Sequence, residues 1–120
     1  MNELSWPLAT EVSKLDLTPK VWQQITKDFT LEAIDFDVKA ELTPTNLDHI
    51  YQLLYPIIKR LIEHDFSAIS QLLYRMAISE ERVAKHIALS PDDSAHAITY
   101  LMVCRECEKV LLRTQFSQGS

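Results

Sequence analysis

Apolar side chains recur every three or four residues along most of the chain, which is the spacing of one face of an α-helix. Between residues 45 and 64, for example, Leu47, Ile50, Leu54 and Ile58 share one face. The pattern predicts helices at about 19–30, 45–64, 66–77, from 79 onward, and 91–116. The last is the longest, so we expect it to be the central packing element.

Prolines mark the expected helix starts. Thr18, Thr43 and Ser90 each precede a proline, and a hydroxyl N-cap followed by proline at the first helical position is a common way to begin a helix. We therefore expect N-caps at these three residues, and a fourth at Ser79.

Residues 34–42 follow a different pattern. Ile34, Phe36, Val38, Ala40 and Leu42 alternate with charged residues, which is the periodicity of a strand. Three alternatives remain open: an extended arm over the helices, half of a two-stranded ribbon, or a strand that pairs with a second copy of the chain.

The fold class predicted from these patterns is all-α: a compact bundle of four to five helices with one extended segment near residues 34–42. We expect a single helical domain over 1–120, with a poorly determined N-terminal segment at 1–17 and a frayed tail at 117–120.

Composition narrows the function further. The formal net charge is −5 and no apolar stretch is long enough to span a bilayer. The first residues lack the pattern of a secretory signal. We therefore expect a cytoplasmic protein with no membrane contact, whose partners are proteins rather than nucleic acid.

The single glycine, Gly119, lies in the tail. Phosphate-binding loops, dinucleotide-binding turns and nucleophile elbows all need glycine where the backbone bends sharply or approaches a ligand. Their usual forms are therefore not available, and we expect no cofactor and a role other than catalysis.

Cys104 and Cys107 have the spacing of a metal or redox pair. A zinc site would need further ligands, for which His86 and His96 are candidates. Both cysteines lie deep inside a predicted helix on its apolar face, which favours two small core residues. Metal binding and redox chemistry remain alternatives.

Residues 69–87 resemble the helix-turn-helix of bacterial DNA-binding proteins. Ala77, Ile78, Ser79 and Val83 occupy the turn and anchor positions of that motif. The resemblance implies that the second helix would read the major groove with Arg82, Lys85 and His86.

The chain departs from the motif in three places. Ala77 replaces the usual glycine, Leu73 is bulky where a small residue is usual, and the second helix opens with Glu80 and Glu81. A plain αα-hairpin capped by Ser79 is the alternative.

Glu108 projects among apolar positions of the last helix, about 40° from Cys104 at 100° per residue. A partly buried acid usually needs a basic partner. We therefore predict a structural ion pair with an arginine, Arg75 or Arg60.

The function predicted from the sequence is a protein-interaction or structural module that self-associates, most simply as a homodimer. Two features motivate it: the unpaired 34–42 segment, and the apolar residues Ile98, Met102 and Phe116 on the outer side of the last helix. The alternatives are a DNA-binding regulator that uses residues 69–87, and a metal or redox protein built on the cysteine pair.

Overall fold

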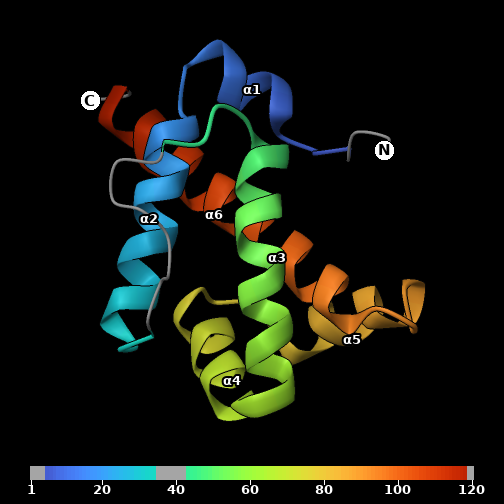
Figure 1. Cartoon of the computed structure of the whole chain (residues 1–120). Helices are drawn as coiled ribbons and strands as arrows, with labels where there is room; N and C mark the ends of the chain where they lie inside the picture. Colours follow the sequence, from blue (N-terminus) through green and yellow to red (C-terminus); the bar gives the residue numbers. More distant parts are fainter. Residues whose placement is uncertain (1–4, 35–42, 119–120) are drawn as a thin grey trace.

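The computed structural model describes residues 5–34 and 43–118, and within them the chain forms six α-helices and no strand (Figure 1). The all-α prediction is confirmed. The helices are α1 (Ala9–Lys14), α2 (Thr18–Leu31), α3 (Leu47–His64), α4 (Phe66–Arg75), α5 (Glu80–Leu89) and α6 (Ser94–Gln118).

Helix α6 is the longest element and forms the centre of the core. Four consecutive residues, from Leu101 to Cys104, are all buried. At 100° per residue they point to every side, so the helix must be covered all round. Helices α1, α2, α3 and α5 pack against it, whereas α4 packs on α2 and α3 (Figure 1).

This arrangement corrects one sequence-based inference about self-association. Ile98 and Met102 are 1% and 0% exposed, so the apolar outer side of α6 is covered by the chain's own helices. Those two residues leave no surface for a partner. The side chain of Phe116 lies outside the described residues.

Two of the predicted N-caps are replaced by residues three positions further along the chain. Helix α3 is capped by Asn46 instead of Thr43: its side chain accepts a hydrogen bond from the His49 N–H at 2.8 Å. Helix α6 starts after Asp93, whose carboxylate accepts from the His96 N–H at 2.9 Å.

The physical reason for the shift is clearest at the start of α6. Ser90 to Asp93 form a turn closed by the Asp93 N–H and the Ser90 carbonyl at 3.0 Å, with Pro91 at the second position, where its fixed φ suits a type I turn. Helix α2 includes Thr18 and is preceded by Leu17, which makes no side-chain cap. The predicted cap at Ser79 is confirmed, because its hydroxyl accepts from the Arg82 N–H at 3.1 Å.

The sequence pattern missed α1. Val12 and Leu17 from this region are buried in the core, but a helix of six residues is too short to show a period. At the other end, α6 continues to Gln118, into the tail that was expected to fray. Within the alternating segment, Ile34 packs partly against the core, and residues 35–42 lie outside the described residues.

Three helices end without the glycine that usually adopts the left-handed conformation there. Asp16, Ala33 and Ala77 have φ of 53°, 56° and 60°. In each case the next N–H bonds back to a carbonyl five residues earlier, which is the Schellman arrangement: Leu17 to Val12 at 2.8 Å, Ile34 to Phe29 at 3.0 Å, and Ile78 to Leu73 at 2.9 Å.

We predict that Ala77→Gly and Ala33→Gly each raise the free energy of unfolding by about 0.5–1 kcal/mol, measured by chemical denaturation. The relief of left-handed strain on a Cβ exceeds the extra chain entropy that glycine brings to the unfolded state. Ala84→Gly is the matched control: it lies inside α5 and should lower stability by about 1 kcal/mol. Equal destabilisation by all three substitutions would contradict the prediction.

Candidate functional site

A cavity of about 260 Å³ lies between the N-terminal segment, α5 and α6, and we call it the α5/α6 pocket. Five of its lining residues were already singled out by the sequence. Arg82 and His86 came from the helix-turn-helix resemblance, Cys104 and Cys107 from their metal or redox spacing, and Glu108 from its position among apolar residues. The lining residues are Trp6, Pro7, Leu8, Leu47, Arg82, His86, Tyr100, Leu101, Cys104, Cys107 and Glu108.

Helical spacing places the polar residues of the α5/α6 pocket. Arg82 and His86 are four residues apart on α5, so they share one face. Tyr100, Cys104 and Glu108 repeat the same spacing on α6. The two polar stripes therefore face the same space.

The N-terminal segment closes one side of the pocket through Trp6. The Trp6 indole N–H donates to Asp48 Oδ1 at 2.9 Å, and the ring stacks on Tyr100 with centroids 4.8 Å apart. The Tyr100 hydroxyl in turn donates to the Ser5 carbonyl at 2.6 Å. These contacts hold an aromatic wall in place.

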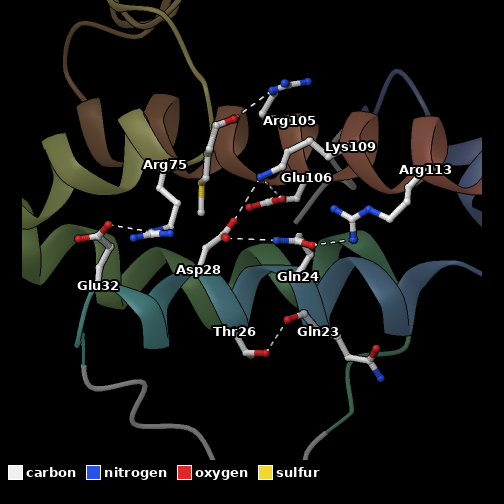
Figure 2. Close-up of polar contacts among 11 residues, drawn as sticks. Gln23, Gln24, Thr26, Asp28, Glu32, Arg75, Arg105, Glu106, Lys109 and Arg113 are labelled. Atoms are coloured by element: carbon white, nitrogen blue, oxygen red, sulfur yellow. Dashed lines mark hydrogen bonds and ion pairs between the residues drawn. The ribbon is translucent and has the colours of Figure 1, made fainter.

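Glu108 pairs with arginine as predicted, but the predicted partner was wrong. Arg82 Nη2 lies 2.7 Å from Glu108 Oε1 and Arg105 Nη1 lies 3.1 Å from Oε2. Arg75 pairs instead with Glu32 at 2.7 Å, as Figure 2 shows. The reason is packing: α5 lies against α6, whereas α4, which carries Arg75, packs on α2 and α3.

The pairing also sets the charge states. Burial by itself raises the pKa of Glu108, but the hydrogen bonds and positive charges of Arg82 and Arg105 outweigh it, so the pKa lies below its ordinary value. The hydrogen bond that Arg82 donates to Glu108 raises the pKa of Arg82. Both partners are therefore ionised at neutral pH.

The two cysteines are buried thiols. Burial raises the pKa of Cys104 to about 11 and that of Cys107 to about 12, so both are protonated at neutral pH, and the thiolate is the form that attacks or binds metal. Among the described residues no group of three or more His, Cys, Asp or Glu could hold a metal ion. His96 lies outside the pocket, 2.7 Å from the Tyr51 hydroxyl.

The three residues that the helix-turn-helix resemblance assigned to DNA do not share an exposed face. Arg82 and His86 line the α5/α6 pocket and are half-buried, while Lys85 is exposed and pairs with Glu81 at 3.4 Å. Positive side chains gather elsewhere, in an open groove of about 500 Å³ between α2 and α6 that is lined in part by Lys20, Lys27 and Arg113.

A second apolar surface, the α4/α5 groove, has a volume of about 440 Å³. Helix α4 packs on α2 and α3, whereas α5 packs on α6. The apolar side chains of α4 and α5 that face each other therefore do not bury each other completely. Phe66 and Tyr74 at this groove are 56% and 89% exposed. The lining residues are Phe66, Ser70, Leu73, Tyr74, Ile78, Glu80, Val83, Ala84 and Ile87.

Two acids are buried side by side where α2 meets α6 (Figure 2). Asp28 is 3% exposed and Glu106 is 0% exposed. Lys109 Nζ lies 3.5 Å from Asp28 and 3.4 Å from Glu106, and Gln24 donates to Asp28 at 3.1 Å. Nothing in the sequence pattern distinguished Glu106, because it lies in a run of alternating charges.

One lysine cannot balance two buried carboxylates, so one of them binds a proton. Burial, followed by the hydrogen bond and charge of Asp28, raises the pKa of Glu106 to about 8, although Lys109 opposes the shift. Neither carboxylate oxygen of Glu106 accepts a hydrogen bond of good geometry from a donor among the described residues, and the Lys109 ammonium at 3.4 Å is an ion-pair contact only. As an acid, Glu106 can donate a hydrogen bond to Asp28.

Comparison of the chain with protein-family models, with curated proteins and with solved structures finds no match. The fold and the two apolar surfaces define an all-α helical protein, and a fold of this class does not by itself specify a function. None of the helices within the described ranges is long and apolar enough to cross a membrane.

We predict that Glu108→Gln lowers the free energy of unfolding by about 1 kcal/mol at neutral pH, because it removes the negative charge, and one of the two acceptor oxygens, that join α5 to α6. Since the pKa of Glu108 is depressed, this contribution is present above the ordinary pKa of a glutamate and is lost as the pH falls through the lowered one. The difference between variant and wild type should therefore vanish in strong acid, as followed by urea unfolding.

A double-mutant cycle of Glu108→Gln with Arg82→Ala isolates this pair. The exposed Glu81 and Lys85 pair is the control, and we expect its cycle to give no more than about 0.5 kcal/mol. Equal coupling energies for the two pairs would contradict the assignment.

We predict that Glu106→Gln makes the protein more stable at pH 8, by roughly 2–4 kcal/mol. Because the pKa of Glu106 is raised in the folded state, its buried side chain is protonated in acid and does not lower the free energy of unfolding there. Wild-type stability then falls with rising pH, because the unfolded chain releases the proton near pH 4.5 and the folded chain only near pH 8. The amide keeps a donor toward Asp28 and removes this slope. Exposed Glu63→Gln is the control, and a variant whose stability falls as steeply as wild type would refute the assignment.

Proposed function

We propose that this protein is an interaction module that self-associates through the α4/α5 groove, pairing with a second copy of itself. The observation that carries the proposal is the exposure of large apolar side chains at an apolar groove. Surfaces of this kind are typical of protein–protein contacts when the residues are contiguous.

The shape of the surface favours a second copy as the occupant. The groove and its most exposed aromatic, Tyr74 at 89% exposure, belong to the same short hairpin. Two copies related by a two-fold axis can therefore each insert Tyr74 into the groove of the other. Such an isologous contact is self-complementary and closes as a dimer.

The amino acids of the groove also suit an interface centre. Tyrosine and phenylalanine are enriched in interface cores, where charged residues are depleted. Among the described residues, Glu80 is the one charged residue that lines the groove. Of its apolar members, Leu73 lies on α4, Val83 lies on α5, and Ile78 lies in the short turn that joins the two helices.

The DNA-binding alternative gains no support from the arrangement of α5. Reading a major groove needs an exposed basic face on the recognition helix. Arg82 is engaged by Glu108, and the helix opens with Glu80 and Glu81. The arrangement of α5 therefore favours an αα-hairpin over a DNA-reading helix.

We predict that the wild-type chain forms a dimer whose fraction rises with concentration in analytical ultracentrifugation. Tyr74→Asp should weaken the dimer by roughly tenfold to thirtyfold, because it places a charge at the centre of the interface. At concentrations where both chains are monomeric, its thermal midpoint should stay close to that of wild type, since the Tyr74 side chain is 89% exposed in the single chain.

Leu89→Asp is the matched control. Leu89 is 79% exposed but does not line the groove, so this variant should dimerise like wild type. A wild-type chain that remains monomeric at millimolar concentration would refute the proposal, as would equal dissociation of the two variants.

A further inference from the structure

The size and walls of the α5/α6 pocket limit what it can hold. Its volume of about 260 Å³ is just below the range of about 300–1,000 Å³ that is typical of sites for drug-sized molecules. Trp6 and Tyr100 supply stacked aromatic faces, and Leu47 and Leu101 supply apolar surface. A flat apolar group of about one ring matches this space.

Arg82 is the group at the pocket that favours an anion. Glu108 lines the pocket beside it and also pairs with Arg105, so the three-residue cluster has an excess of one positive charge, although Arg105 itself does not line the pocket. A guanidinium has five N–H donors, and Arg82 directs only Nη1 and Nη2 at Glu108. Arg82 therefore keeps donors that can bind a carboxylate in addition to Glu108.

His86 adds a second polar group on the same side. Its Nδ1 lies 3.2 Å from the Arg82 carbonyl, which fixes the ring and leaves Nε2 without a hydrogen-bond partner among the described residues. The ring is stacked beside Tyr100, with centroids 6.2 Å apart. With Nδ1 donating to the Arg82 carbonyl, the Nε2 of a neutral imidazole is an acceptor, so His86 extends the aromatic wall and Arg82 is the donor for a carboxylate.

From these contacts we infer that the α5/α6 pocket binds a small aromatic carboxylate, with its ring against Trp6 and Tyr100 and its carboxylate on Arg82. The site is separate from the α4/α5 groove: Arg82 and His86 belong to one side of α5, and Val83 and Ile87 to the other. The inference therefore does not depend on self-association.

Benzoate is the probe, and the readout is the indole N–H signal of Trp6 in a two-dimensional ¹H–¹⁵N NMR spectrum. Trp22 is buried in α2 and does not line the pocket, so its indole signal is the internal control. We expect a saturable shift of the Trp6 signal with a Kd on the order of 1 mM, as suits a ligand of this size. The Trp22 signal should not move.

Two probes of similar size separate charge from apolar contact. Benzyl alcohol and benzylamine should bind at least about tenfold more weakly than benzoate, because neither brings a negative charge to Arg82. Cys104→Leu should abolish the benzoate shift, since a larger side chain fills the pocket while Arg82 and Glu108 are unchanged. Arg82→Lys should weaken the binding of benzoate but should not make the pocket prefer benzylamine.

The inference is overturned if the Trp6 signal shows no saturable shift, if benzylamine binds as tightly as benzoate, or if Cys104→Leu binds benzoate as well as wild type does. The same titration of the Tyr74→Asp variant should give an unchanged Kd. That result keeps the test of the pocket distinct from the test of the dimer.

Discussion

Helix α6 has no solvent-facing side along its middle, and the rest of the fold is arranged to cover it. The run from Leu101 to Cys104 points in all directions and is buried throughout. A helix that is apolar all round is stable in water only inside other elements. Four helices therefore surround it, and α4 forms an outer layer on α2 and α3.

The contact between α5 and α6 differs from the contacts that the other helices make with α6. No residue of α5 is fully buried, and polar contacts contribute much of the link. Glu108 on α6 binds Arg82 on α5. The Nε of Arg105 donates to the Met76 carbonyl at 3.0 Å, which ties α6 to the end of α4, just before the turn into α5. Helix α5 lines a pocket with α6 on one side and an open groove with α4 on the other.

Covering α6 completely also explains the buried acids. Glu106 lies on the side of α6 that α2 covers, so it enters the core together with its apolar neighbours. There it meets Asp28 and a single lysine, Lys109. A proton on Glu106 lowers the cost of burying the two carboxylates together, because both side chains are shielded from solvent. The same packing that makes α6 central therefore gives the protein a pH-dependent element.

Local sequence determined helices α2 to α6, because helical periodicity and the Ser79 cap depend on neighbouring residues alone, whereas the six-residue α1 is too short to show a period. It also determined that Glu108 needs an arginine. The tertiary structure decided which one: α5, rather than α4, packs on α6, so Arg82 is the partner and Arg75 binds Glu32. Only packing could show that Ile98 and Met102 are covered, that Glu106 is buried, or that Arg82, His86 and Cys104 line one pocket. Residues far apart in the chain meet through the directions in which whole helices pack, and no local pattern of side chains records those directions.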